Sequence, residues 1–472
     1  MILSGLTIKE VYNHLNTKSV PSTWMKSKQR IEKDYQYLQQ LLNENDPPRI
    51  YGVNTLVGHL DEENLSDQEV LAFQDELIRN HKIGTEPYFD EFTARCIGFV
   101  KVNQVSSGGT CISPELYEKL MDVIFKEDFK PEIPKHASYS SGDVIPGAHW
   151  AYELQTYLSK NKSYTLRPKE GLSLINGSFV HVGYALSLFI QVNNVWKNFV
   201  YNSILNAILV KANKTNYTEY LYTDPNAVPT AKIQRRIWSI LNRQQRDYTR
   251  QDPVSIRALP QILSSFYDSI ISFKHTLELE LNKRSDNPLI VYEAKEPLSQ
   301  GSFLSPNLTM DTSKLIECLL MVMWHLERRV HYLLSGEVEG IPLNGSTAKN
   351  PLGYIQVPKL MTAILEEARL IGGRRSFASG GSTSYGIEDF WTHGIETTHI
   401  LEKILQKISY MLSIELVVSV NVYRQFYNDK LKEFSVPEME DDDFDTLSKT
   451  YRETILNGEI KFMDKFVDNT FL

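Results

Sequence analysis

The chain has 472 residues, 42% hydrophobic and 23% charged, so it can bury a large core as one extended fold or as two to three domains. The formal net charge of -8 gives no electrostatic case for nucleic-acid binding, and a small molecule or a protein is the better partner. The three cysteines lie far apart, without the spacings of a zinc site or a disulfide framework, which fits a reducing cytosol. We find no signal pattern and no apolar stretch near the ~18 residues that span a bilayer, and therefore expect a cytoplasmic protein without a metal or a membrane partner.

Helical periodicity dominates wherever a period can be read. Apolar residues recur at three- and four-residue spacings over lengths too great for strands, in 178–204, 256–281, 309–334 and 393–423. Because these stretches lack a strict heptad with charged flanks, they predict a mainly α fold, a bundle of long core helices joined by short irregular segments. We expect one continuous unit with an N-terminal part at 1–175, a central bundle at 176–430 and a C-terminal helical segment at 431–472.

Glycine, proline, serine and asparagine interrupt the helical pattern at five places. These are the segments 51–58, 136–147, 251–253, 286–288 and 371–386. Loops that interrupt rigid helices are where catalytic side chains tend to lie.

One of these loops contains Ser140-Ser141-Gly142-Asp143. Taken alone, such a sequence is most often an ordinary turn or helix cap. It also permits a reaction, because the amide nitrogen of Gly142 can attack the carbonyl two residues back and close a five-membered ring. Loss of water from Ser141 would then leave an exocyclic alkene, an electrophile made without an external cofactor.

Further segments, in consistent order, favour the second interpretation. The chain resembles the histidine/phenylalanine ammonia-lyase family over most of its length. The matching segments are Tyr51-Gly52-Val53-Asn54-Thr55, 77–84, Ser140-Ser141-Gly142-Asp143, 167–178, 251–261, Ser285-Asp286-Asn287-Pro288-Leu289, Glu327-Arg328-Arg329 and Glu388-Asp389. Any one of these segments is weak, whereas eight in register are strong.

The resemblance implies a prosthetic group, 4-methylideneimidazol-5-one, formed from Ser140, Ser141 and Gly142 with assistance from Asp143. The α-amine of an amino-acid substrate would add to this electrophile and become a good leaving group. Tyr51 would remove the β-proton, which requires that nearby positive charge or hydrogen-bond donors lower its pKa. Glu388 is the remaining catalytic candidate.

The same resemblance implies a set of substrate-binding residues. Arg257 would hold the substrate carboxylate, because a guanidinium binds carboxylate bidentately and stays charged. The neutral amides and the aromatic residue expected beside the substrate and the prosthetic ring are Asn176, Gln251, Asn287 and Phe303. His81 would hydrogen-bond an imidazole or a phenol, with a satisfied core histidine as the alternative. Together with Glu388-Asp389, His81 favours histidine as the substrate.

Four positions depart from the family pattern. Ser140 stands where alanine is usual, and Leu56-Val57-Gly58 replaces Gly-Phe-Gly after the Tyr51 segment. Val254 replaces a tyrosine, and Gly301-Ser302-Phe303-Leu304 loses two polar groups. These changes alter the pocket and leave the substrate, and lyase activity itself, open.

The resemblance implies the long-helix bundle of the fumarase/aspartase-like superfamily, assembled as a homotetramer whose active sites draw residues from three subunits. The expected activity is that of a carbon–nitrogen lyase releasing ammonia from histidine or a related aromatic amino acid. Three alternatives stay open: an aminomutase, a tailoring enzyme of secondary metabolism, and a catalytically silent homologue that serves as a binding subunit.

Overall fold

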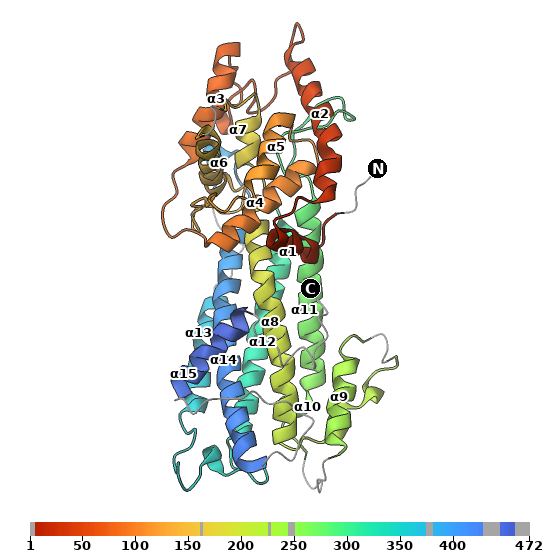
Figure 1. Cartoon of the computed structure of the whole chain (residues 1–472), viewed down its shortest axis with the longest axis vertical. Coiled ribbons are helices and arrows are strands. Elements are labelled where there is room, and N and C mark those ends of the chain that lie inside the picture. The colour runs from red at the N-terminus through yellow and green to blue at the C-terminus, as the bar shows by residue number, and fades with distance from the viewer. Residues whose placement is uncertain are drawn as a thin grey trace. The chain divides into compact units, whose positions relative to one another are not determined.

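The computed structural model describes residues 5–160, 164–224, 228–243, 251–373, 381–427 and 444–457. Over these residues the chain is mainly helical, as predicted (Figure 1). The α-helices are α1 (Ile8–Thr17), α2 (Ser22–Leu42), α3 (Asp67–His81), α4 (Glu91–Ser106), α5 (Pro114–Val123), α6 (Val144–Ser159), α7 (Glu170–Ile175), α8 (Phe179–Leu209), α9 (Ala231–Leu241), α10 (Val254–Arg257), α11 (Leu259–Asn282), α12 (Pro306–Leu333), α13 (Val357–Gly372), α14 (Gly394–Tyr427) and α15 (Phe444–Asn457). Short 3-10 helices are η1 (Gly58–Leu60), η2 (Lys214–Tyr217), η3 (Glu219–Leu221), η5 (Leu343–Gly345) and η6 (Ser384–Gly386). Strands β1 (Leu289–Ile290) and β2 (Pro297–Leu298) pair antiparallel, with Leu289 opposite Leu298.

The four long helices predicted from the periodicity are confirmed as α8, α11, α12 and α14. The break predicted at 136–147 ends early, because α6 already begins at Val144. Of the break predicted at 371–386, residues 374–380 lie outside the described part of the chain.

The chain divides into two compact units, each built from separate stretches of sequence. Unit 1 contains 1–187, 274–311 and 376–399, and unit 2 contains 188–273, 312–375 and 400–472. The boundaries fall inside the four long helices, so each of these helices contributes residues to both units. The three consecutive segments expected from the sequence stay a prediction.

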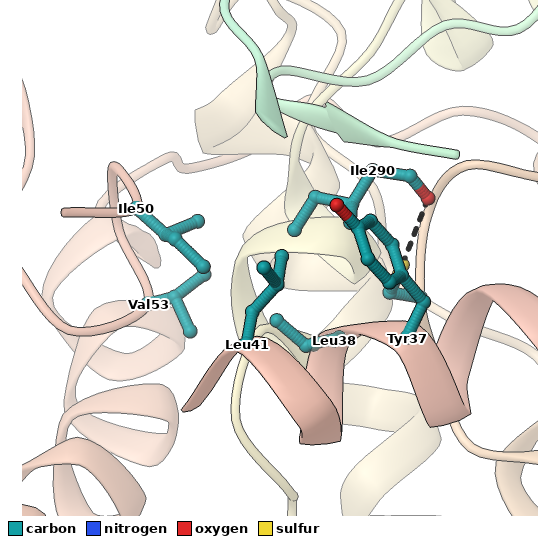
Figure 2. Packing of buried hydrophobic residues seen from close by; sticks show 7 residues of the cluster. Tyr37, Leu38, Leu41, Ile50, Val53 and Ile290 are labelled. Atoms are coloured by element: carbon teal, nitrogen blue, oxygen red, sulfur yellow. Dashed lines mark hydrogen bonds between the residues drawn. The ribbon is translucent and has the colours of Figure 1, made fainter. Parts of the chain in front are cut away.

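In unit 1 a hydrophobic cluster holds the loop that carries Tyr51. Ile50 and Val53, on either side of Tyr51, are fully buried with residues of α2, among them Leu38 and Leu41 (Figure 2). Ile290 of β1 completes the contact. Burial of apolar side chains at about 25 cal/mol per Å² therefore fixes the backbone of this loop.

In unit 2 the core lies among the long helices. Phe199 of α8 packs edge-on against Phe266 of α11. Arg329 of α12 forms a buried ion pair with Glu415 of α14, at 2.5 Å between Nε and Oε1. Its Nη1 donates to Ser203 Oγ of α8, also at 2.5 Å. A buried charge needs such full pairing, because leaving one partner alone is strongly destabilising.

One stretch, Glu170–Leu209, is long and apolar enough to span a membrane, which corrects the expectation that no stretch comes close. It comprises α7 and α8, and 94% of its most apolar window is buried inside the protein. A helix that is buried on all faces in the core of a large protein is also apolar all round, and α8 fits this description.

Candidate active site

The segment 138–143, directly before α6, is a tight turn on left-handed backbone. Ser140, Gly142 and Asp143 have φ angles of 65°, 77° and 50°. Side chains other than glycine adopt this conformation only with strain. A Cβ at Gly142 would also lie 2.6 Å from Asn176 Oδ1. The turn therefore requires glycine after Ser141. Ser140 and Asp143, which flank Ser141-Gly142, have strained backbone conformations.

Asp143 is the buried anchor of this turn. Its Oδ1 accepts a hydrogen bond from Ser138 Oγ at 2.8 Å, and its Oδ2 accepts from the backbone N–H of His181 at 3.0 Å. Ser138 Oγ in turn accepts from the N–H of Ser140 at 2.9 Å. Burial raises the pKa of Asp143 to about 6, against the weaker opposing effect of these two donors. Near neutral pH the carboxylate is thus poised to accept a proton.

The start of α14 holds the other side of the turn. The N–H of Ile395 donates to Ser140 Oγ at 2.9 Å, and the N–H of His393 donates to the carbonyl of Tyr139 at 3.1 Å. Thr392 Oγ1 donates to the carbonyl oxygen of Ser140 at 3.3 Å. The hydroxymethyl group of Ser140, one of the departures noted above, thus satisfies an N–H of the first helical turn that has no partner within the helix.

A cavity of about 320 Å³ lies beside Ser141, lined only by residues of unit 1. Its walls are formed by Tyr51, Val57, Gly58, His59, Leu77, His81, Tyr139, Ser141, Val144, Leu172, Ile175, Asn176, Asn287, Phe303, Thr383, Ser384 and Glu388. The cavity brings together most of the predicted site residues from segments far apart in the sequence. Ser140, Gly142 and Asp143 lie in the same turn as Ser141.

Ser141 and Tyr51 each bond to a polar group among the described residues. Ser141 Oγ donates to Glu388 Oε2 at 2.9 Å. The hydroxyl of Tyr51 accepts from the N–H of Gly58 at 2.8 Å. Burial nevertheless raises the pKa of Tyr51, and the nearby carboxylate of Glu388 raises it further, outweighing the Gly58 donor. The lowered pKa expected for a base at Tyr51 is therefore not found within this one chain.

His81 lies at the C-terminal end of α3, half-buried at the cavity wall. Its Nδ1 is 2.7 Å from the carbonyl oxygen of Leu77, one helical turn back. A carbonyl only accepts hydrogen bonds, so this contact assigns a proton to Nδ1, and in the neutral ring Nε2 is then an acceptor. His81 therefore both makes the backbone hydrogen bond expected of a core histidine and lines the cavity.

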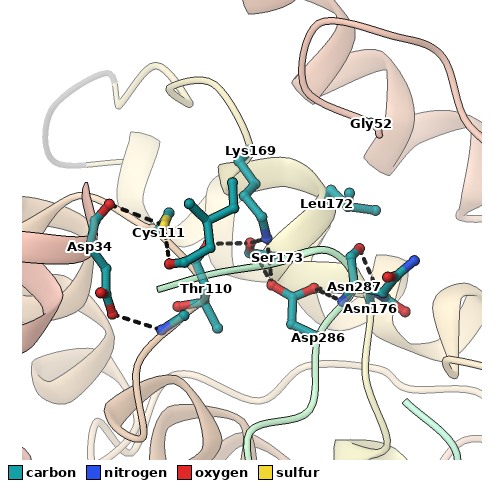
Figure 3. Close-up of polar contacts among 12 residues, drawn as sticks. Asp34, Gly52, Thr110, Cys111, Lys169, Leu172, Ser173, Asn176, Asp286 and Asn287 are labelled. Carbon is teal, nitrogen blue, oxygen red and sulfur yellow. Dashed lines mark hydrogen bonds and ion pairs between the residues drawn. The ribbon is translucent and has the colours of Figure 1, made fainter. Parts of the chain in front are cut away.

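Asn176 and Asn287 are backed by a buried ionic network (Figure 3). Asn176 Nδ2 donates to Asp286 Oδ1 at 3.3 Å and to the carbonyl of Asn287 at 3.2 Å. Asp286 also pairs with Lys169 at 2.7 Å, both side chains being fully buried. Lys101 Nζ donates to the carbonyl of Asn176 at 2.8 Å. These contacts fix the side-chain amide of Asn176 at the cavity wall. The side chain of Asn287 is held separately, because its Oδ1 accepts from the N–H of Gln300 at 2.9 Å.

Gln251 and Arg257 are not among the residues that line the cavity, and they belong to unit 2. They bond to each other on an exposed surface, where Arg257 Nη1 donates to Gln251 Oε1 at 2.6 Å. Val254, which replaces the family tyrosine, is 62% exposed. Arg257, the predicted carboxylate-binding residue, is thus outside the set of residues that line the cavity beside Ser141.

Several polar residues at the site were missed by the sequence reasoning. Tyr139 OH lies 2.9 Å from Thr383 Oγ1 and donates to Glu388 Oε2 at 3.4 Å. Within the turn Ser138 bonds to Asp143, and from outside it Thr392 bonds to Ser140. Ser138 is next to the motif and could have been tested as a turn-bracing residue, whereas nothing local to Thr392 or Thr383 indicates their contacts.

Comparison with known proteins places the chain in a family. The model of a family described as aromatic amino acid lyase matches residues 6–430. A probable histidine ammonia-lyase of Thermoplasma volcanium is 25% identical over 439 residues, 88% of this chain and 87% of the relative. A histidine ammonia-lyase of Legionella pneumophila is 25% identical over 336 residues, 66% of each chain.

Solved structures share the fold at lower identity. Tyrosine aminomutase of Streptomyces globisporus has a TM-score of 0.84 at 19% identity, covering 98% of both chains. Histidine ammonia-lyase of Trypanosoma cruzi has a TM-score of 0.81 at 19% identity, covering 99% of this chain and 95% of that one. The family match spans most of the chain, and the chain therefore belongs to the aromatic amino acid lyase family.

Proposed function

We propose that this protein is an ammonia-lyase that eliminates ammonia from an aromatic amino acid, with L-histidine as the favoured substrate and a urocanate-type product. The observation that carries the proposal is the position of Ser141. It lies on a strained turn at the wall of a cavity that Tyr51 and His81 also line. An electrophile, a base and a polar group for the substrate ring are the parts that such an elimination needs.

The turn fits the 4-methylideneimidazol-5-one group. Ring closure joins residues two positions apart, and the left-handed conformations of Ser140 and Gly142 fold the chain back over this short span. Gly142 has no Cβ to crowd its nitrogen. Ser140 would contribute only backbone atoms, so its hydroxyl does not oppose closure. Once formed, the group supplies an electrophilic carbon that takes up the substrate amine.

The residues around the turn have separate tasks in the proposal. The side-chain amides of Asn176, bonded to Asp286, and of Asn287, bonded to the N–H of Gln300, present hydrogen-bonding groups to the prosthetic ring and the substrate. Phe303 offers an aromatic surface to the substrate ring. The carboxylate of Glu388, which accepts from Ser141 Oγ, is placed to attract the ammonium group of the substrate.

The proposal includes a homotetramer that completes the site. Tyr51 cannot act as a base near neutral pH while burial and Glu388 keep its pKa raised. A guanidinium nearby would lower this pKa and bind the substrate carboxylate. Arg257 is exposed and belongs to unit 2, so we propose that Arg257 of another subunit reaches the cavity. Three unpaired, buried cysteines accord with the cytosolic location that we also propose.

Histidine is favoured over phenylalanine because of the tautomer of His81, and over tyrosine because Glu388-Asp389 resembles the histidine- and phenylalanine-type sequences. With Nδ1 bonded to the carbonyl of Leu77, Nε2 can accept a hydrogen bond from the N–H of a substrate imidazole. A phenyl ring offers no such donor, so phenylalanine would leave Nε2 without a partner in a desolvated site.

Intact mass and a substrate panel test the proposal. We expect the purified protein to lack the mass of two water molecules relative to its sequence. We expect near-UV product absorbance with histidine to exceed that with tyrosine or phenylalanine, and Ser141→Ala to abolish turnover. An unmodified mass, or full turnover by Ser141→Ala, would overturn the mechanism.

The same panel separates the alternatives. Chiral analysis that finds a β-amino acid would indicate an aminomutase, the activity named for one of the structures that share the fold. A matured protein that turns over none of the three amino acids would favour a tailoring enzyme with an unusual substrate. An unmodified and inactive protein would favour a binding subunit.

A further inference from the structure

The carbonyl oxygen of Ser140 has a side-chain donor that no family motif pointed to. Thr392 Oγ1 lies 3.3 Å from this oxygen, and both residues are 4% exposed. Ring closure removes this oxygen as water, so a contact to it belongs to the chain before cyclisation. Thr392 thus touches an atom that reacts during maturation.

Two backbone contacts keep this donor aligned. The N–H of Ile395 bonds to Ser140 Oγ at 2.9 Å, and the N–H of His393 bonds to the carbonyl of Tyr139 at 3.1 Å. Residues 392–395 therefore form three hydrogen bonds with residues 139 and 140. The hydroxyl of Thr392 is therefore preorganised beside the carbonyl of Ser140, because the contacts at the start of α14 hold the two segments together.

Ring closure places a specific demand on this carbonyl. The nitrogen of Gly142 bonds to the carbonyl carbon of Ser140, the π electrons move to the oxygen, and the Gly142 N–H proton ends on that oxygen. The resulting hydroxyl leaves with the N–H proton of Ser141 as the first water, which forms a C=N bond. Ser141 then loses its Cα proton and its hydroxyl as the second water.

We propose that Thr392 is a catalytic residue of this self-cyclisation. An amide carbonyl is a weak electrophile, and a fixed donor at its oxygen stabilises the negative charge that develops during attack. Thr392 also solvates the same oxygen as it departs in the first water. The inference rests on the electrophile in the proposed function, and is independent of which amino acid is the substrate.

The matched pair Thr392→Ser and Thr392→Ala tests the hydroxyl, because the two variants differ by one oxygen atom. Each is made by cell-free synthesis of the full chain, and intact mass is followed over time for the loss of two waters. We expect Thr392→Ser to mature at close to the wild-type rate and Thr392→Ala about 100-fold more slowly. Thr392→Val, which keeps the volume of threonine, should be as slow as Thr392→Ala.

The reference for folding is Ser141→Ala, which lacks the hydroxyl that leaves as the second water and so cannot form the alkene. Far-UV circular dichroism of each variant is compared with that of Ser141→Ala, so that a slow variant is known to be folded. Equal maturation rates for the serine and alanine variants would overturn the inference. If Thr392→Ala alone misfolds, the comparison of Thr392→Ser with Thr392→Val decides in the same way.

The outcome is separable from that of the proposed function. A wild-type chain that loses two waters but deaminates no aromatic amino acid would refute the proposed activity and leave the role of Thr392 standing. Histidine turnover together with equal maturation of Thr392→Ser and Thr392→Ala would refute the role of Thr392 alone. An unmodified wild-type mass would overturn both.

Discussion

The hydroxyl of Ser140 stands where the family has alanine, and it bonds to the N–H of Ile395 at the start of α14. Ser140→Ala leaves this buried N–H without an acceptor. By analogy with the loss of a helix cap, we expect a decrease of about 1 kcal/mol in the free energy of unfolding, measured by urea denaturation. Maturation should persist, because ring closure uses only backbone atoms of this residue. An unmodified intact mass for Ser140→Ala would contradict this expectation.

His81 provides the residue-scale test of substrate choice. In His81→Leu the acceptor Nε2 is replaced by an apolar side chain, so binding of an imidazole loses a hydrogen bond and binding of a phenyl ring does not. We expect kcat/KM for histidine to fall roughly 10- to 100-fold, and that for phenylalanine to stay equal or rise. His81→Gln, which restores a polar group, is the matched control. A uniform decrease for both substrates would indicate that His81 only supports α3.

At the scale of elements, the sequence predicted the structure best where apolar residues repeat at a single helical spacing over a long stretch. The apolar spacing of 178–204 and 393–423 predicted α8 and α14, because a long amphipathic or fully apolar repeat has few other solutions. The turn before α6 was predicted from Gly142, whose freedom at positive φ is a local property. Contacts such as that of Thr392 with Ser140 join segments about 250 positions apart, and no periodicity encodes them.

Helix α4 carries a buried lysine, Lys101, from which we predict a pH dependence of the stability of the protein. Burial lowers the pKa of Lys101 to about 7, from its usual value of about 10.5. Between these values the unfolded chain binds a proton that the folded chain does not, so the stability contribution is complete above about 10.5 and is lost as pH falls through about 7.

Lys101→Met is the variant that exposes this dependence. We expect the free energy of unfolding of the wild type to rise with pH between about 7 and 10 relative to that of Lys101→Met, in urea denaturation at matched ionic strength. Loss of the hydrogen bond to the carbonyl of Asn176 shifts the curve for Lys101→Met by a constant amount and leaves its slope unaffected. Parallel curves for the two proteins would show that Lys101 keeps an ordinary pKa.

At the scale of the whole molecule, the predicted site residues are divided. Tyr51 and Ser141 line a cavity of unit 1, whereas the Gln251–Arg257 pair lies exposed in unit 2. The buried Tyr51 has a raised pKa that a nearby cation would lower, and Arg257 is an exposed cation bonded to the amide of Gln251. In a closed symmetric oligomer the same surfaces meet at every interface, so one such contact would complete every site.

Complementation between two inactive variants tests this division. Tyr51→Phe lacks the base, and Arg257→Gln lacks the carboxylate-binding group, so each should be nearly inactive as a homo-oligomer. If a site takes these residues from different chains, co-expression at equal amounts should restore roughly a quarter of wild-type turnover, because each site draws its two residues independently. Mass spectrometry of the assembly and of the prosthetic group controls for mixing and maturation. Turnover no higher than the mean of the two variants would mean that Tyr51 and Arg257 act within one chain, and Arg257 would then have to leave Gln251 to reach the cavity.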